Sequence, residues 1–230
     1  GNQLQPFRRL HGGNEIFDAF RVVKVTLEGG EGTGKSTLIR SLNDYFVSNG
    51  HQVILTREPG GTEGAEAIRD LLVKGSANRW NAMSEICLFY AAREDHITRV
   101  IKPALSDGKI VISDRFFDST RAYQGELGLH ENNVINCLEE NIVGQCLPDL
   151  TLILDIDVKI GLARANSRND DEGRFEAKKI EFHEKLRQNF LNIAKKEPKR
   201  CKVIDASMSK DEVFSQAIEY IKSLQGDKNG

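Results

Sequence analysis

The sequence predicts an α/β protein in which a parallel β-sheet is covered by helices on both faces. Short runs rich in Val, Ile and Leu alternate with longer segments of helical pattern, which is the order of strands and crossover helices in such a sheet. Several runs are almost continuously apolar, as expected for strands that are covered on both faces. A length of 230 residues suits one compact domain, with or without a mobile insertion.

Five runs are predicted to be strands, and the segments between them are long enough for crossover helices. These runs are residues 21–28 (RVVKVTLE), 51–58 (HQVILTRE), 109–114 (KIVISD), 150–156 (LTLILDI) and 202–207 (KVIDAS).

Two amphipathic helices are predicted from apolar residues that recur at every third or fourth position. The first covers residues 82–105 and carries Ile86, Phe89, Tyr90, Ile97, Ile101 and Leu105. The second lies at the C-terminus and carries Val213, Ala217, Ile218, Ile221 and Leu224, which we expect in the core.

Two segments are predicted to lie outside the packed core. Residues 161–175 (GLARANSRNDDEGRF) are polar and charged with little to bury, which predicts a mobile surface segment. Residues 1–20 have arginines but no continuous apolar stretch of the kind found in a secretory signal. We expect them to be a flexible leader or an added extension, so the predicted domain spans residues 21–230.

The composition excludes some classes of protein and ligand. With 39% hydrophobic and 29% charged residues, the chain can form a core, and it has no apolar run long enough to span a membrane. A net charge of −2 argues against a broad electrostatic grip on nucleic acid. We expect a small-molecule ligand, neither nucleic acid nor membrane as partner, and a cytoplasmic location. Four cysteines lack metal-site spacing and are expected to be small core residues: Cys87, Cys137, Cys146 and Cys201.

The stretch LEGGEGTGKSTL, residues 27–38, predicts a phosphate-binding loop. It matches G-x-x-x-x-G-K-[ST] between a predicted strand and a predicted helix, the context of a P-loop NTPase-type fold. Glycines let backbone N–H groups approach an anion, and the following helix offers its positive end. In this pattern Lys35 reaches the β and γ phosphates of a nucleoside triphosphate, and the Ser36 hydroxyl ligates Mg²⁺. The predicted nucleotide-binding residues are Gly29, Gly30, Glu31, Gly32, Thr33, Gly34, Lys35, Ser36 and Thr37.

An acid at the end of a neighbouring strand usually gives this Mg²⁺ its second protein contact. Asp114 and Asp155 both end apolar runs. We prefer Asp114, because Arg115 follows at once and places a cation beside the acid. Asp155 is the alternative, and a strand-end or helix-capping role is expected for it.

A phosphate-binding loop alone does not separate a kinase from a switch GTPase, a transporter ATPase or a helicase. Further stretches follow in order: TREPGGT (56–62), LFYAARE (88–94), DRFFDSTRAYQG (114–125) and PDLTLILDI (148–156). Together with the loop, they resemble the bacterial thymidylate kinases from about residue 21 to the C-terminus. The resemblance implies transfer of the γ-phosphoryl group of ATP to dTMP with Mg²⁺. It also implies a five-stranded parallel sheet, a mobile LID at about residues 161–176, and a homodimer.

The implied reaction needs no general base, because the attacking phosphate oxygen is already largely ionised at pH 7, its second pKa being about 6. Catalysis then depends on positioning two polyanions and on neutralising charge, for which arginine forks suit phosphate. By the resemblance, Arg57 and Arg115 bind the acceptor phosphate, and Lys35 and Arg115 act in catalysis. The family also commonly has a cis peptide bond before the residue that corresponds to Pro59.

The resemblance assigns further residues to the acceptor. Phe89 and Arg93 are four residues apart, hence on one helix face, and would stack on thymine and donate to its edge. Tyr123 and Gln124 would lie against sugar and base, where the tyrosine favours deoxyribose. Glu31 would contact the 3′-hydroxyl or metal-bound water. From the residues alone, Phe89 also suits a core position and Glu31 a solvent-exposed one.

The resemblance does not determine which residue is the catalytic arginine of the LID. Some relatives carry an arginine just after the loop acid, where this chain has Gly32, and those that lack it use a LID arginine. We expect Arg168 first and Arg174 next, with Arg164 also in the segment. The chain departs from the family pattern at Gly173, where an aspartate usually precedes Arg-Phe-Glu.

Two other functions stay open from the sequence. One is a P-loop kinase with a different nucleoside or nucleotide acceptor, since a thymine methyl group is worth only ~0.8 kcal/mol, about fourfold over dUMP. The other is a nucleotide-binding switch. Against it, the D-x-x-G at residues 170–173 lies in the charged segment, and no N-K-x-D motif is present.

Overall fold

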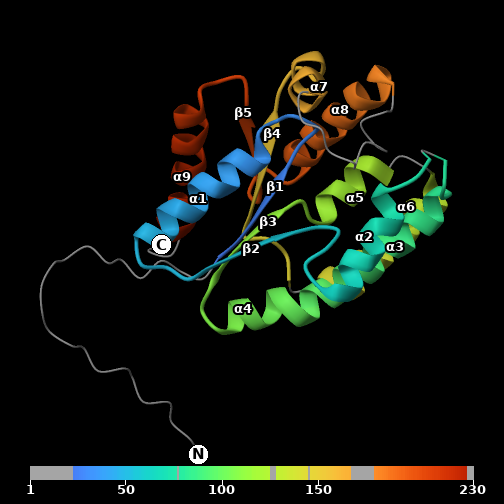
Figure 1. Ribbon diagram of the computed structural model, residues 1–230, viewed down its shortest axis with the longest axis horizontal. Helices are drawn as coiled ribbons and strands as arrows, with labels where there is room; N and C mark the ends of the chain where they lie inside the picture. Colours follow the sequence, from blue (N-terminus) through green and yellow to red (C-terminus); the bar gives the residue numbers. More distant parts are fainter. Residues whose placement is uncertain (1–22, 77, 125–127, 145, 167–178, 227–230) are drawn as a thin grey trace, which may run out of the picture.

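The protein is described by a computed structural model that covers residues 23–76, 78–124, 128–144, 146–166 and 179–226 (Figure 1). Within these residues five strands form one parallel sheet, in the order β2-β3-β1-β4-β5. The strands are β1 (Lys24–Glu28), β2 (Val53–Arg57), β3 (Ile110–Asp114), β4 (Leu150–Asp155) and β5 (Cys201–Asp205). The predicted α/β class and the predicted strands are confirmed, with ends that differ by a few residues.

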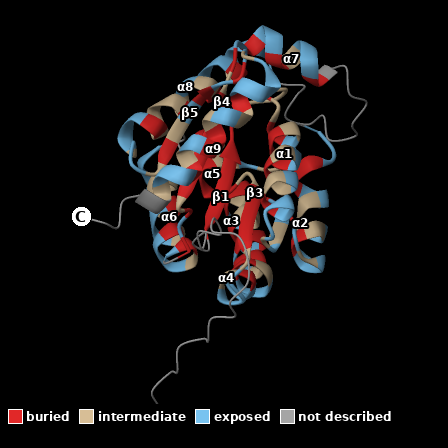
Figure 2. Ribbon diagram, turned by 90° about the vertical axis from the view of Figure 1, so that its left-hand side faces the viewer, coloured by how far each residue is buried: buried red, intermediate tan, exposed pale blue. Residues whose placement is uncertain are grey.

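The helices cover both faces of the sheet (Figures 1 and 2). They are α1 (Lys35–Ser48), α2 (Glu63–Val73), α3 (Ala82–His96), α4 (Lys102–Ser106), α5 (Phe117–Gln124), α6 (Leu129–Leu138), α7 (Val158–Asn166), α8 (Ile180–Lys196) and α9 (Lys210–Gly226). Two π-helical segments, Ile97–Ile101 and Glu139–Val143, follow α3 and α6.

Apolar side chains on opposite faces of the sheet build two main core clusters. Ile110 and Ile112 of β3 belong to the cluster that includes α1 and α9, whereas Val111 between them belongs to the cluster with α3. This alternation is the period of a strand, and it explains why the central strands read as continuous apolar runs. The burial colours in Figure 2 show the sheet as the buried middle layer.

The helix predicted over residues 82–105 is helical throughout, although residues 97–101 form a π-helical segment. Asn81 caps its start, since its side chain accepts from the backbone N–H of Ser84 at 2.8 Å. Most of the predicted apolar stripe is buried, but Phe89 is only half-buried and lines a pocket. The C-terminal stripe of α9 lies in the core as predicted.

The prediction that all four cysteines are core residues is half wrong. Cys146 and Cys201 are buried, but Cys87 and Cys137 are exposed. The two exposed cysteines lie on helices α3 and α6, where helical phase rather than apolar neighbours decides which side chain faces water. Among the described residues, no group of three or more His, Cys, Asp or Glu side chains could hold a metal ion.

Two predicted segments lie wholly or partly outside the described residues. These are residues 1–20 and the end of the polar segment, including Arg168 and Arg174. The start of the polar segment, expected to be a surface loop from residue 161, is helical as far as Asn166.

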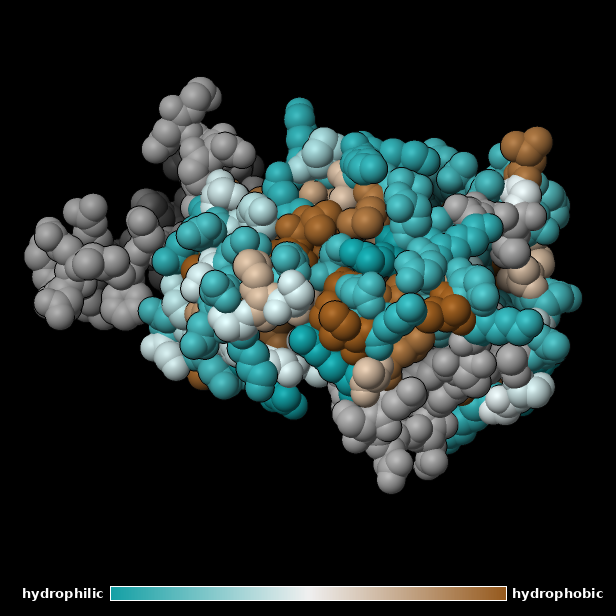
Figure 3. Space-filling view, turned by 90° about the horizontal axis from the view of Figure 1, so that it is seen from above, coloured by the Kyte–Doolittle hydropathy of each residue, from teal (hydrophilic) through white to brown (hydrophobic). Residues whose placement is uncertain are grey.

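None of the described helices has the length and apolarity needed to cross a membrane. The surface seen from above is mainly hydrophilic, with apolar side chains gathered in patches (Figure 3).

The strand register places three loops at one edge of the sheet. Leu27 of β1 and Arg57 of β2 both pair with Asp114 of β3. Parallel strands end on the same side, so the segments that follow β1, β2 and β3 leave the sheet next to one another. The predicted functional residues gather at this edge.

Candidate active site

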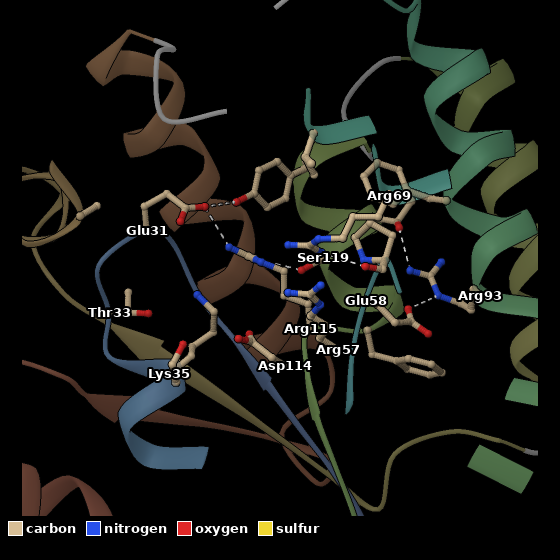
Figure 4. Close-up of a pocket in the computed structure, with 18 of the residues that line it drawn as sticks. Glu31, Thr33, Lys35, Arg57, Glu58, Arg69, Arg93, Asp114, Arg115 and Ser119 are labelled. Atoms are coloured by element: carbon tan, nitrogen blue, oxygen red, sulfur yellow. Dashed lines mark hydrogen bonds and ion pairs between the residues drawn. The ribbon is translucent and has the colours of Figure 1, made fainter. Parts of the chain in front are cut away.

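A pocket of about 230 Å³ opens at this edge of the sheet (Figure 4). Its walls come from the phosphate-binding loop and the segments after β2 and β3, and from helices α2, α3, α5 and α7. Predicted site residues in its lining are Glu31, Gly32, Thr33, Gly34, Lys35, Ser36, Arg57, Phe89, Arg93, Asp114, Arg115, Tyr123 and Gln124. Other residues, to which the sequence assigns no role, also line the pocket, among them Glu58, Arg69, Ser119 and Thr120.

The phosphate-binding loop is wrapped around its own lysine. Helix α1 begins at Lys35, and Lys35 Nζ donates to the carbonyl oxygens of Gly29 at 3.2 Å and Gly30 at 3.0 Å. Burial, and then the guanidinium of Arg115, lower the pKa of Lys35. A phosphate group in the pocket would add negative charge beside this buried ammonium and favour its charged form.

The backbone around Gly32 leaves no room for a side chain at this position. Its φ is +67°, and a Cβ atom built on it would lie 1.9 Å from the carbonyl oxygen of Gly161 in α7. The arginine that some relatives place here would meet backbone, which cannot move as a flexible side chain can. By contrast, a Cβ on Gly30 would meet none of the described residues within 4 Å.

The structure separates the two candidate acids for a metal. Asp114 lines the pocket, and its buried Oδ1 has no hydrogen-bond partner among the described residues. Asp155 is instead held in a two-fold ion pair, its oxygens lying 2.7 and 2.9 Å from Arg187 Nε and Nη2. A buried carboxylate oxygen without a donor fits a site for a divalent cation or its bound water.

Arg115 is held in place from two sides. Its Nη2 donates to Glu31 Oε1 at 3.0 Å and its Nη1 to Ser119 Oγ at 3.1 Å (Figure 4). Its φ is +67°, a left-handed conformation that costs energy for a residue with a side chain. The Tyr123 hydroxyl also donates to Glu31, at 3.2 Å. Glu31 therefore faces the pocket, not bulk solvent.

The charges around Glu31 keep it ionised. Burial alone favours the neutral acid, but the guanidinium of Arg115 and the ammonium of Lys35 outweigh burial and hold the pKa of Glu31 below its ordinary value. An anion inside the phosphate-binding loop is thus tolerated because two cations lie beside it.

A buried acid, Glu28, is linked to Arg115 through the hydroxyl of Ser119. Its Oε2 accepts from Ser119 Oγ at 2.6 Å, and its Oε1 accepts from the Phe116 backbone N–H at 2.8 Å. Burial, and then the carboxylate of Asp118, raise the pKa of Glu28 to about 8. Ser119 connects this acid to the arginine.

Arg93 is fully enclosed at the far end of the pocket. Its Nε donates to Glu58 Oε2 at 2.7 Å and its Nη2 to Thr120 Oγ1 at 3.1 Å, while His96 lies 2.9 Å from the other Glu58 oxygen. Its third nitrogen, Nη1, is buried without a hydrogen-bond partner among the described residues. One strong donor is left over at the pocket wall.

Gln124, the last residue of α5, supplies an acceptor in the same pocket. Its Nε2 donates to Glu85 Oε2 at 3.3 Å, and its buried Oε1 has no partner within the described part of the chain. Phe89 lies in the same lining and offers a ring face of the kind that stacks on a planar base. The residues that line the pocket therefore include one with an unpaired donor, one with an unpaired acceptor and one with an aromatic ring.

Arg57 and Arg69 lie where the segment after β2 crosses the pocket. Arg57 Nη2 is 3.0 Å from Glu66 Oε2, and both side chains are about half exposed. Arg69 Nη1 donates to the carbonyl oxygen of Pro59 at 2.8 Å, and the bond between Glu58 and Pro59 is cis. Sequence reasoning missed Arg69, because nothing in its neighbourhood on α2 distinguishes it from a surface arginine.

Arg164 lies on α7, where its Nη1 donates to the carbonyl oxygen of Ala206 at 3.3 Å. Arg168 and Arg174 lie outside the described residues, so their predicted role stays a prediction.

Comparison with known proteins agrees with this geometry. The family model described as thymidylate kinase matches residues 27–217. The chain is 54% identical to the thymidylate kinase of Caulobacter vibrioides, over 88% of this chain and 97% of that protein. It is 51% identical to the thymidylate kinase of a Bradyrhizobium strain, over 82% of this chain and 84% of that protein.

The crystal structure of thymidylate kinase from Ehrlichia chaffeensis aligns with a TM-score of 0.67 and 35% identity, over 86% of this chain and 98% of that chain. The sequence relatives and the fold agree along most of the chain, which therefore belongs to the thymidylate kinase family.

Proposed function

We propose that the pocket transfers the γ-phosphoryl group of ATP to dTMP, and that it selects the acceptor base by a fixed donor and a fixed acceptor. The observation that carries this proposal is the pair of buried, unpartnered atoms Arg93 Nη1 and Gln124 Oε1 in the described part of one pocket. Thymine offers O4 as an acceptor and N3–H as a donor, which complements the pair. Cytosine has a donor, its N4 amino group, where thymine has O4, and an acceptor at N3 where thymine has N3–H. It would therefore leave both buried protein atoms without a hydrogen bond.

On the donor side, Lys35 and the backbone N–H groups of the loop would hold the phosphates of ATP. Ser36 and Asp114 are the residues that would hold Mg²⁺. In the described part of the chain, Asp114 has a buried oxygen without a hydrogen-bond partner, whereas both oxygens of Asp155 are paired with Arg187. A bound Mg²⁺ neutralises charge on the phosphates.

On the acceptor side, Arg115 and Arg57 would bind the phosphate of dTMP. Arg115 is already oriented by Glu31 and Ser119, so little freedom is lost when the phosphate arrives. Arg57 would exchange its ion pair with Glu66 for the phosphate. Arg168 or Arg174 would complete the charge around the transferred group, as the catalytic arginine of the LID.

The sugar would lie against Tyr123 and Glu31. The Tyr123 hydroxyl is bonded to the Glu31 carboxylate, which fixes the ring beside the phosphate-binding loop. A ring held in this way would crowd a 2′-hydroxyl, and the carboxylate could accept from the 3′-hydroxyl. Deoxyribose would be preferred for this reason.

We also propose a homodimer in the cytoplasm, as the family resemblance implies. The side of α3 away from the site carries exposed Cys87 and Ala91, small side chains over which a second copy could approach the helix. Sedimentation of the purified chain tests this; a monomer at micromolar concentration would contradict the proposed dimer.

The proposed reaction is tested by ADP release from ATP with a panel of monophosphates. dTMP should be used best, dUMP somewhat less, since the methyl group is worth about fourfold, and dCMP and AMP poorly. Equal turnover of dTMP, dCMP and AMP would replace this proposal with a P-loop kinase of broad acceptor range.

A further inference from the structure

We propose that Glu85 is a positioning residue that makes the pocket reject cytosine, because it fixes which end of the Gln124 amide faces the base. Glu85 does not line the pocket, whereas Gln124 does. The inference rests on the proposed function, since it concerns how the acceptor base is recognised.

A side-chain amide can turn over with almost no change in shape, exchanging its acceptor for its donor. Gln124 is only 3% exposed, so bulk water does not select one orientation for it. The contact that selects is with Glu85, whose Oε2 lies 3.3 Å from Gln124 Nε2. An ionised carboxylate has only acceptors, so the NH₂ group must face Glu85 and Oε1 is left for the pocket.

Glu85 is held in a fixed place by its helix. It lies in the first turn of α3, whose N-cap is Asn81, and is 9% exposed. Its carboxylate therefore lies beside the Gln124 amide, away from bulk water.

Glu85, Phe89 and Arg93 are spaced by four residues on α3 and therefore share one helix face. Two of them line the pocket directly, as the aromatic ring and the donor. The third acts one step behind the pocket wall, through Gln124. A single helix face thus controls both hydrogen bonds of the base-reading pair.

The test is Glu85→Gln, which keeps the shape but supplies both a donor and an acceptor to Gln124. The Gln124 amide can then turn over and present Nε2–H to N3 of cytosine. We expect the ratio of kcat/KM for dTMP to that for dCMP to fall about tenfold, because one repaired hydrogen bond is worth about that factor. The ratio for dTMP to dUMP should stay unchanged, because uracil and thymine present the same edge.

Two controls separate positioning from a general loss of packing. Glu139→Gln removes a charge from an acid that is equally buried, at 9% exposure, but that bonds to Tyr90 and Arg121 instead of Gln124. It should leave both ratios as in the wild type. In a Gln124→Met background, adding Glu85→Gln should change neither ratio further.

The proposal is overturned if Glu85→Gln lowers kcat/KM equally for dTMP, dUMP and dCMP, or if it acts as strongly without the Gln124 amide. Melting temperatures of all variants show that each is folded at the assay temperature. Failure of the wild type to phosphorylate dTMP would instead refute the proposed function, so the two results are distinguishable.

Discussion

The guanidinium of Arg115 lies 3.0 Å from the carboxylate of Glu31. An arginine that follows β3 thus forms an ion pair with an acid of the phosphate-binding loop, and both residues line the pocket. Ser119 bonds to the same arginine and to the buried Glu28. Arg115 is therefore oriented before a phosphate reaches it, which is the condition for an efficient electrostatic contact.

Replacing Arg115 with alanine should lower kcat/KM for dTMP by a factor that corresponds to at least ~2 kcal/mol. The phosphate would lose a pair of charge-assisted hydrogen bonds from a largely buried guanidinium. Arg57→Ala should cost less, since the side chain of Arg57 is 51% exposed and that of Arg115 only 18%. Steady-state kinetics with dTMP measures both losses. Wild-type kinetics for Arg115→Ala would remove Arg115 from the acceptor site, whereas equal losses in the two variants would contradict only the expected order.

Asp114→Asn should raise the Mg²⁺ concentration that gives half-maximal ADP release by at least about tenfold, because the amide keeps the shape but loses the charge. Asp155→Asn is the matched control, since its carboxylate is already paired with Arg187 and should not be needed for the ion. A shift of the Mg²⁺ requirement in the control alone would show that the alternative acid holds the metal.

Gly32→Ala should destabilise the fold by at least about 2 kcal/mol, because the added methyl group meets the Gly161 backbone in a left-handed conformation. Gly30→Ala adds an atom that none of the described residues approaches within 4 Å, and it should leave the melting temperature nearly unchanged. Calorimetry of the two variants compares them directly. Similar melting temperatures for both would mean that α7 does not approach the loop as closely as described.

Glu28 should make the wild type less stable as the pH rises. Its pKa is about 8 in the folded chain against an ordinary 4.5, so it binds its proton more tightly when folded. Below pH 4.5 both states are protonated. Between about pH 4.5 and 8 the unfolded chain ionises first and the free energy of unfolding falls, by about 1.4 kcal/mol per pKa unit at most.

Glu28→Gln removes this titration while its amide can still accept from Phe116 and donate to Ser119. Urea unfolding at pH 5 and pH 8 should therefore show a smaller loss of stability in the variant than in the wild type. Identical losses would mean that Glu28 ionises in the folded protein as easily as it does in water.

Much of the fold and part of the site could be predicted from the sequence, because their signals are local. Strands such as β1 and β3 are short apolar runs, and the phosphate-binding loop is a contiguous motif. Their meeting at one edge follows from parallel strand pairing, which brings Arg57 and Asp114 side by side.

The contacts that orient the base-reading residues could not be predicted, since they join positions far apart in the chain. Glu58 to Arg93 and Glu85 to Gln124 are such pairs, and no periodicity links them. Spacing alone also could not tell a core position from a pocket position, as Phe89 shows. Its spacing is that of a core stripe, but α3 borders the pocket, so one residue of the same stripe lines the pocket wall.

In the proposed reaction two nucleotides lie end to end in this pocket, the donor at Lys35 and the acceptor between Arg115 and Arg93. Inhibition by adenosine and thymidine joined through five phosphates tests it most directly, since such a molecule must fill both sites at once. We expect competition with ATP and with dTMP alike, and a large loss of inhibition when cytidine replaces thymidine. Competition with ATP alone, at equal strength for either base, would contradict it.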